Sequence, residues 1–301
     1  KKARDNLKNK GLLVDKNRFD TYDSLETAED LESLFNVLTS VKDINNRSAV
    51  FTAFSMSANI NFSKIIENNF DTYYYEKLTD TFNNLPDHFG TWNMWQEGMR
   101  DKIFIPQFHG REHLNLKFFN RFLNEKNKEL LACIQNGSYG GFSVNPFKSI
   151  SYTAAFDFEN REEIEGHKEI ILDGLNLFED VFGFRAMHFN APGAHEHHSL
   201  ENFLDLNGIK FIDTDLIKKE HQGDGKYSYR IYKQGGKNRF NQRYFIRNCI
   251  FEPLLKPYNN YVESCLKEIE IAFKWNKPAN ISSHRVNFAG KIDPKVRDSG
   301  L

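Results

Sequence analysis

The sequence predicts one α/β domain, folded as an irregular or incomplete (β/α) barrel. Short apolar runs with strand character alternate with amphipathic, helix-like stretches, and repeated βα units of this kind build a mostly parallel sheet. No segment rich in Pro, Gly or Ser divides the 301 residues into separate units. Polar residues directly follow four of the strand-like runs, which is where barrel enzymes assemble their active sites.

The first half of the chain shows apolar residues at helical spacing and at strand spacing in turn. Leu31, Leu34 and Leu38 share one helical face, and AVFTAFS is typical of a buried strand. Glycines between 137 and 141 mark a loop. The elements expected here are a helix over 25–41, a strand over 49–55, helices over 63–69 and 92–100, a strand over 103–108 and a long helix over 114–135.

The second half continues the alternation. Ile164, Ile171, Leu175 and Phe178 share one face of a strongly amphipathic helix. The polar segment 218–243 predicts a loop or hairpin excursion from the domain. The other elements expected here are a helix over 162–182, a strand over 186–189, a helix over 199–207, strands over 209–212 and 244–251, a helix over 258–275 and a strand over 279–282.

The composition excludes several kinds of partner. Lys and Arg number 40 against 41 Asp and Glu, and this balance favours neither nucleic acid nor an acidic lipid surface. No stretch is long and apolar enough to span a membrane. The 28 Phe and 12 Tyr residues are ample for a core and also suit stacking against sugar rings.

The cysteines carry little functional information. Cys133, Cys249 and Cys265 are widely spaced, so we expect buried thiols rather than a disulfide framework or a metal cluster. Free thiols slightly favour a reducing, cytoplasmic compartment. The sequence shows no signal peptide and no initiator Met, so the true N-terminus is not visible and the compartment stays open.

The stretch from His109 to His113 carries the strongest functional signal. It follows the strand-like run 103–108, and its two histidines are four residues apart. On one helical turn that spacing puts both imidazoles on the same side, within reach of one cation. Neutral imidazole is a good ligand for zinc and its neighbours. The spacing alone fits a metal site and two surface histidines equally well, and the strand-end position favours the metal.

Three more polar clusters follow strand-like runs. They are MSANINF with Asn59 and Asn61, NAPGAHEHH with Asn190, Pro192 and His197, and SHRVNF with His284, Arg285 and Asn287. A solvated loop is the plainer interpretation of the individual histidines in HEHH. We expect His284 to be functional, whereas Asn59 and Asn61 fit helix caps as well as substrate contacts.

The motifs resemble those of the polysaccharide deacetylases, a family with a NodB-type catalytic domain, and one bacterial branch of it in particular. The resemblance covers nearly the whole chain. Its landmarks are YDSLETAEDLESLF, VFTAFSMSANINFSKI, PQFHGREHLN, FNAPG and KPANISSHRVNFAG. It implies a barrel of the glycoside hydrolase and deacetylase type, and an acetylated carbohydrate as substrate.

The resemblance also implies roles for single residues. In that family a histidine pair with three residues between binds the metal, which His109 and His113 match, and a later histidine is the general acid, which His284 matches. A loop with Arg-x-Pro lines the site. Pro192 keeps the proline and Asn190 stands at the arginine position, so that charge is expected from an arginine elsewhere, either Arg111 or Arg285. One divalent ion is implied, with zinc first and cobalt, nickel or manganese as alternatives.

The remaining candidates are expected to support the ligands or to bind substrate. Arg111 and Glu112 point away from the ligand face if the stretch is helical. Arg285 and Asn287 would orient the acid or hold sugar hydroxyls. Asn59 and His197 are further candidates for substrate contact.

One departure from the family concerns its Asp-Asp motif, which supplies the catalytic base and another metal ligand. The chain opens with KKARDNLKNKGLLVDK and shows no such motif. The domain over 1–301 is therefore expected to be trimmed at both ends. If the pair were truly absent, the metal site would be incomplete and activity doubtful.

Three other functions stay open. HGREH also matches the H-x-x-E-H order of inverted zinc peptidases, with Glu112 as base. A glycoside hydrolase on a related barrel would need two carboxylates flanking the scissile bond, and no pair stands out. A non-catalytic carbohydrate-binding relative would account for the missing Asp pair.

Overall fold

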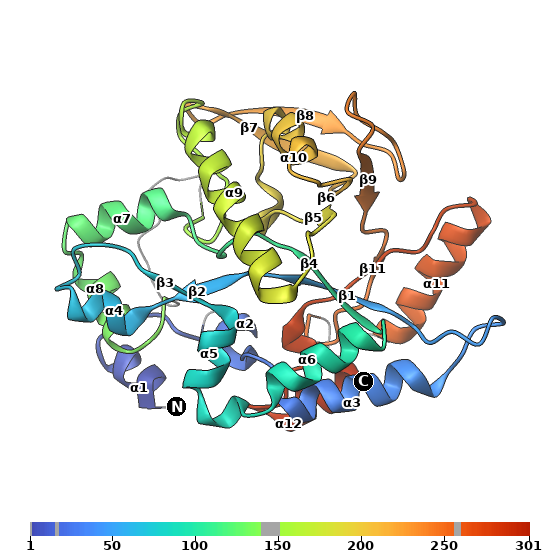
Figure 1. Cartoon of the computed structure of the whole chain (residues 1–301), viewed down its shortest axis with the longest axis horizontal. Helices are drawn as coiled ribbons and strands as arrows, with labels where there is room; N and C mark the ends of the chain where they lie inside the picture. Colours follow the sequence, from blue (N-terminus) through green and yellow to red (C-terminus); the bar gives the residue numbers. More distant parts are fainter. Residues whose placement is uncertain (1, 16–17, 140–150, 256–259) are drawn as a thin grey trace.

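A five-stranded parallel sheet lies at the centre of the fold (Figure 1). In spatial order its strands are β1 (Phe51–Ser55), β4 (Phe104–Phe108), β5 (His188–Phe189), β6 (Phe211–Thr214) and β9 (Arg243–Ile246). All neighbouring pairs are parallel, so the carboxyl ends of the strands meet at one edge. The computed structural model describes residues 2–15, 18–139, 151–255 and 260–301, which pack as one α/β domain.

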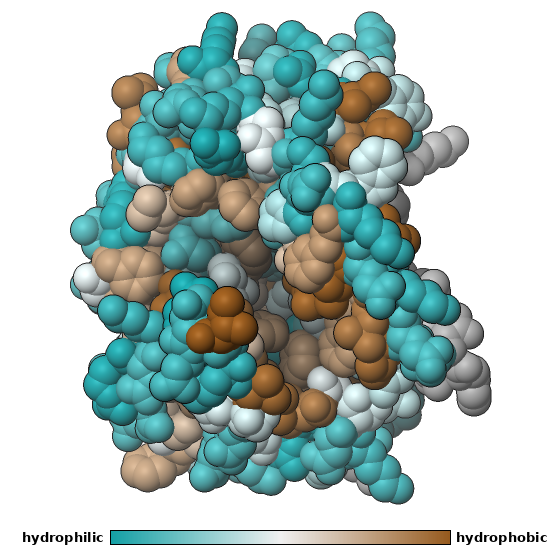
Figure 2. Space-filling model, turned by 90° about the vertical axis from the view of Figure 1, so that its right-hand side faces the viewer, coloured by the Kyte–Doolittle hydropathy of each residue, from teal (hydrophilic) through white to brown (hydrophobic). Residues whose placement is uncertain are grey.

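The sheet is open in its hydrogen bonding. Beyond β9, the short strands β10 (Cys249–Ile250) and β11 (Ile281–Ser282) form a separate parallel pair. Within the described residues no ladder joins this pair to β9 or to β1. The face on the side of α11 (Tyr261–Lys274) is hollowed at its centre and bordered by apolar surface (Figure 2). The α/β class with a parallel sheet is confirmed, but closure into a barrel is not seen among these strands.

One face of β4 carries much of the core. Phe104 and Phe108 alternate with less buried residues, as a strand covered on one side requires. The Phe104 ring meets Trp95 of α6 (Thr91–Arg100) edge-on, with the ring centroids 4.9 Å apart. Phe108 contacts Phe178 of α9 (Glu163–Phe182) at 6.1 Å between centroids. Burying each such ring stabilises the fold by about 1.5–3 kcal/mol, so these contacts hold β4 firmly in place.

The other elements surround this core. The helices are α1 (Lys2–Asn9), α2 (Arg18–Tyr22), α3 (Ala28–Ser40), α4 (Phe62–Glu67), α5 (Leu78–Asn84), α7 (Leu116–Asn124), α8 (Lys128–Gln135), α10 (Glu201–Leu206) and α12 (Pro294–Gly300). The strands are β2 (Ala58–Ile60), β3 (Tyr75–Lys77), β7 (Ile217–Gly223) and β8 (Lys226–Ile231). The β7–β8 hairpin falls almost wholly within the polar segment 218–243 and lies with α10 at the end of the molecule shown uppermost in Figure 1.

Two expected elements are divided. The helix expected over 114–135 breaks after α7, because Lys126 has a positive φ and the Asn127 side chain caps α8. The strand expected over 244–251 is interrupted between β9 and β10, where the Asn248 side chain accepts a hydrogen bond from the Asn280 backbone. Apolar periodicity does not register such caps, which act through single polar atoms.

The cysteines and the membrane expectation also have clear outcomes. Cys133, Cys249 and Cys265 are free and buried, as expected. Among the described helices, none combines the length and the apolar character that crossing a membrane requires.

Candidate functional site

Polar side chains gather at the carboxyl ends of four strands of the central sheet. His109 follows β4, Asn190 follows β5, Asp213 lies in β6, and Arg247 follows β9. The Asn190 carbonyl accepts a hydrogen bond from His109 Nδ1 at 2.7 Å, and Asn190 Nδ2 donates to Asp213 Oδ2 at 3.1 Å. Arg247 Nε lies 3.3 Å from the same Asp213 oxygen. Four strands thus contribute to one connected polar cluster, which we call the strand-end site.

His109 and His113 face each other without sharing a helix. The segment between them is a loop, and α7 begins only at Leu116. The chain turns at Gly110, whose φ of +103° suits glycine, and Pro192 lies 3.3 Å from where a Cβ would be. The two imidazole centroids are 5.3 Å apart. The expected helical turn was wrong, yet the loop brings the pair together.

Both imidazoles are held neutral. Burial lowers the pKa of His109 to about 3, and the neighbouring His113 lowers it further. Burial also lowers the pKa of His113. The hydrogen bond to the Asn190 carbonyl requires a proton on Nδ1 of His109, so the lone pair of the neutral ring is on Nε2. A metal-ligating histidine usually has this arrangement.

His284 lies after β11 and is paired with a buried carboxylate. Glu252 accepts a short hydrogen bond from His284 Nδ1 and another, at 2.8 Å, from Asn287 Nδ2. Arg18 also forms an ion pair with Glu252. Burial alone would raise the pKa of Glu252, but these hydrogen bonds outweigh it and lower that pKa. The charge of His284 lowers the pKa of both His109 and His113, which puts His284 within electrostatic reach of the pair.

The two arginines expected to replace the family arginine are engaged elsewhere. Arg111 is buried and donates to Glu112 at 2.7 Å and to Asp173 at 2.6 Å. Arg285 pairs with Asp23, its Nη2 lying 2.9 Å from Oδ2. Both expectations miss Arg247, whose positive charge lowers the pKa of His109. Arg247 follows β9 directly, but the sequence predicted one strand over 244–251 with Arg247 inside it, so the strand-end rule could not name it until the break after β9 was known.

Of the other residues expected at the site, some support it and others lie away from it. Pro192 is buried against Gly110, and Asn287 is fully buried and holds Glu252. Asn59 lies in β2 and donates to Thr81 Oγ1 at 3.0 Å, so its amide is engaged away from the strand-end site. Asn61 is the N-cap of α4, which fits the cap interpretation.

A second histidine cluster lies on the loop after β5. His197, His198 and Glu220 of β7 place potential ligand atoms within 4.8 Å of one another, so they could hold a metal ion. The His197 side chain is only 4% exposed, which corrects the solvated-loop interpretation for that histidine, whereas His195 and His198 are partly exposed. Burial lowers the pKa of His197 to about 4, whereas the hydrogen bonds from His198 overcome burial and lower that of Glu220 to about 2. We call this group the loop–hairpin cluster.

The loop–hairpin cluster and the His109–His113 pair differ in the number of potential metal ligands. Within the described ranges, the loop–hairpin cluster is the one set of three His, Cys, Asp or Glu residues close enough to share an ion. His109 and His113 form a pair with no described carboxylate completing such a set. The family that the sequence resembles would add an aspartate there.

Comparison with known proteins found no matching family model, no matching curated protein and no matching solved structure.

Proposed function

We propose that the protein is a metal-dependent hydrolase that removes acetyl groups from a carbohydrate. The observation that carries the proposal is the facing pair of neutral imidazoles, His109 and His113, at the carboxyl edge of a parallel sheet, with His284 in electrostatic reach. The pair offers ligands for a cation, and His284 offers a proton. The resemblance of the motifs supplies the acetylated carbohydrate as substrate and an incomplete (β/α) barrel as the fold.

His109 and His113 would hold the ion. Two neutral imidazole nitrogens suit zinc first and cobalt, nickel or manganese as alternatives. The hydrogen bond from His109 Nδ1 to the Asn190 carbonyl orients the ring for such a role. Once bound, a divalent ion would polarise the acetyl carbonyl and lower the pKa of a water molecule.

The proton chemistry of the leaving group falls to His284. Water adds to the acetyl carbonyl carbon and loses one proton to solvent. As the bond between that carbon and the sugar nitrogen or oxygen breaks, His284 donates its proton to the leaving atom, and acetate is released. Glu252 orients the imidazole and stabilises its charged form through their hydrogen bond. Arg247 and Asn190 lie on the same polar edge and would hold sugar or acetyl oxygens.

The alternative as an inverted zinc peptidase has less support. Its motif requires Glu112 to act as a base, but Glu112 is 3% exposed and is hydrogen-bonded to Arg111 and Tyr73. A buried carboxylate in such contacts cannot reach a substrate water. A glycoside hydrolase would need two free carboxylates, whereas Asp213 and Glu252 each pair with an arginine.

The test is acetate release from N-acetylated chitooligosaccharides and from O-acetylated xylan, with zinc, cobalt, nickel or manganese added to chelator-treated protein. Activity should return with at least one metal. His113→Ala should lose both activity and one equivalent of bound metal, while His195→Ala, a partly exposed histidine of a neighbouring loop, should retain both.

Three results would reject the proposal. Metal content and turnover equal to wild type in His113→Ala would remove the pair from the site. Release of reducing ends without acetate would favour a glycosidase. Saturable sugar binding with no product under any metal would favour a non-catalytic relative.

A further inference from the structure

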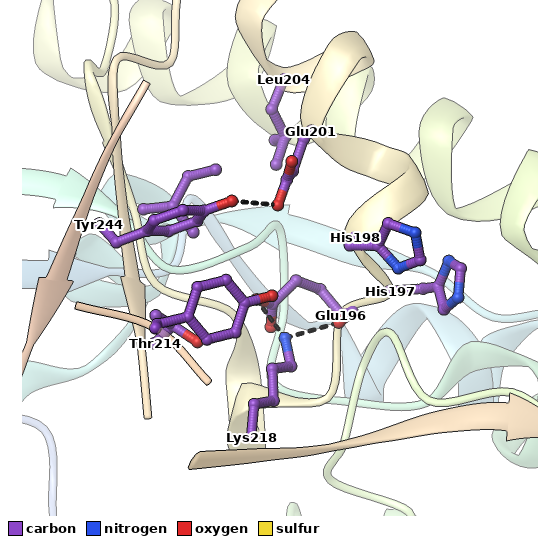
Figure 3. A pocket seen from close by; sticks show the side chains of 10 residues that line it. Glu196, His197, His198, Glu201, Leu204, Thr214, Lys218 and Tyr244 are labelled. Atoms are coloured by element: carbon purple, nitrogen blue, oxygen red, sulfur yellow. Dashed lines mark hydrogen bonds and ion pairs between the residues drawn. The ribbon is translucent and has the colours of Figure 1, made fainter. Parts of the chain in front are cut away.

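The loop–hairpin cluster joins two segments that are separate in sequence. His197 and His198 follow β5 on the loop that also carries Asn190 and Pro192, and Glu220 lies in the middle of β7. His198 donates from its backbone N and from Nδ1 to the two oxygens of Glu220, each at 2.9 Å. His197 and His198 line a pocket with Lys218, Thr214 and Tyr244 (Figure 3).

One atom in this cluster lacks a partner. His197 Nε2 is buried and has no hydrogen bond in the described structure. It lies 3.7 Å from Glu220 Oε2, which is too far for a hydrogen bond. A buried polar atom without a partner costs about 1–3 kcal/mol. Its position beside a carboxylate and a second imidazole is one that a cation would fill.

We propose that His197, His198 and Glu220 bind a divalent transition metal, zinc in particular, at a structural site separate from the His109–His113 pair. Two imidazoles and a carboxylate are a usual zinc donor set. In a tetrahedral site with bonds of about 2.0–2.1 Å, neighbouring ligand atoms are about 3.3 Å apart. The 2.9 Å and 3.7 Å separations of Glu220 Oε2 from the two imidazoles bracket that value, and all three ligand atoms lie within 4.8 Å of one another, so the side chains would draw together around an ion.

The hydrogen bonds around the cluster can rearrange to admit an ion. The Ser199 backbone N–H donates to His197 Nδ1 at 3.2 Å, so in this arrangement Nδ1 holds the lone pair and Nε2 the proton. Binding an ion through Nε2 would exchange that contact for a hydrogen bond from Nδ1 to Ser199 Oγ, which lies 2.8 Å away. His198 would give up the proton that it now donates to Glu220, and the ion would take that place. Lys218 is paired with Glu196, at 2.5 Å between Nζ and Oε1. Gln222 Nε2 donates to Glu220 Oε2 at 2.9 Å, and an ion on that oxygen would displace this amide as well as the His198 proton.

The site would tie the β7–β8 hairpin to the loop after β5. That loop supplies the Asn190 carbonyl, which orients His109, so the ion would stabilise the active edge without touching substrate. Mass action then predicts a concentration-dependent rise in melting temperature. At a metal concentration about 100 times the Kd, the rise should be roughly 5 °C for a chain of this size.

The experiment uses the full chain, stripped with chelator and then titrated with Zn²⁺ or Co²⁺ alone. His113→Ala removes the metal pair of the proposed function, and it should still bind one equivalent and show the rise in melting temperature. Adding Glu220→Gln to it should abolish both, since the amide keeps the size of the side chain but is a poor ligand. His195→Ala, added in the same way, is the matched control and should leave the remaining equivalent in place.

The inference does not depend on activity, so its failure is distinguishable from that of the proposed function. A single Glu220→Gln variant that binds as much metal as wild type would overturn the proposed site. So would a folded His113→Ala variant, judged by circular dichroism, that takes up no Co²⁺. If Glu220→Gln fails to fold, His197→Ala in the wild-type chain should still lose one equivalent, and full retention there would also overturn the site.

Discussion

The two histidine pairs of this chain meet their partners in different ways. His109 and His113 sit on one short loop, and their support, Asn190, comes from the neighbouring strand. His197 and His198 are adjacent in sequence, and their carboxylate, Glu220, comes from a hairpin that leaves the sheet. The first pair was visible from spacing, whereas the second resembled a solvated loop. Spacing reveals a site only when the ligands are local.

The buried carboxylates of the two regions also differ, in the direction of their pKa shifts. Burial raises the pKa of Asp213 in the strand-end site to about 6, above its ordinary value of 3.8. Glu220 is also buried, but the hydrogen bonds from His198 lower its pKa to about 2. The ionised carboxylate of Asp213 therefore destabilises the fold, as charged groups in functional sites often do, whereas the hydrogen bonds to Glu220 stabilise it. The following variants test that contrast.

The largest effect is expected from His284→Ala, because general acid catalysis is worth about 10²- to 10⁴-fold in turnover. Metal content and melting temperature should stay close to wild type, since the ring is about half exposed. Acetyl esters with good leaving groups should lose less than acetamides, because they need less protonation. Equal losses on all substrates, together with a lower melting temperature, would indicate a structural histidine and remove the acid from the strand-end site.

The next effect concerns stability and pH. A rise of the Asp213 pKa from 3.8 to about 6 costs the folded state about 3 kcal/mol, at about 1.4 kcal/mol for each pH unit. The cost is absent below pH 3.8 and complete above pH 6. Asp213→Asn should therefore have a higher free energy of unfolding in urea than wild type at pH 8. The gain should be at most about 3 kcal/mol, reduced by the lost contact with Arg247. The difference in unfolding free energy should close toward pH 4.

Glu220→Gln should show the opposite trend in metal-free protein. Its lowered pKa stabilises the fold above its ordinary value of 4.5, and this contribution is lost as the pH falls through about 2. The variant should be less stable than wild type at pH 8, with the difference narrowing in acid. Parallel pH dependences for the Asp213 and Glu220 variants would contradict the contrast between the two regions.

A moderate effect is expected from Glu252→Gln. Groups that orient a reacting or ligating histidine typically contribute about 10- to 100-fold. Because the amide can still accept one hydrogen bond but cannot stabilise a charged imidazole, kcat should fall while KM changes little. The pH–rate profile should also lose part of its dependence on the acid. An unchanged profile with a lower melting temperature would assign Glu252 a packing role only.

The smallest effects come from two glycines on α9. A Cβ at Gly174 would lie 2.9 Å from both Arg111 Cβ and Phe108 Cζ, so Gly174→Ala should destabilise the fold by about 1–3 kcal/mol and disturb the loop that carries His109. A Cβ at Gly166 would meet no atom within 4 Å, and Gly166→Ala should stabilise the fold by about 0.5–1 kcal/mol. Equal effects, measured by urea unfolding, would show that α9 does not support the strand-end site.

The sequence by itself determined the α/β alternation, most helices and the ends of β1, β4 and β5. These follow from local periodicity: the Phe residues of β4 and the apolar face of α9 are buried wherever they pack, so their patterns show without knowledge of the partner. It also indicated His109, His113 and Asn190, because strand ends of a parallel sheet meet at one edge.

The tertiary structure decided which charges meet. Arg247 rather than Arg111 or Arg285 lies beside Asp213, Glu252 holds His284, and Glu220 reaches the HEHH loop. It also decided that no ladder closes the sheet among the described residues and that the HGREH stretch is a loop. Each of these depends on the pairing of polar atoms from distant segments, and such pairing is specific in three dimensions but leaves no period in the sequence.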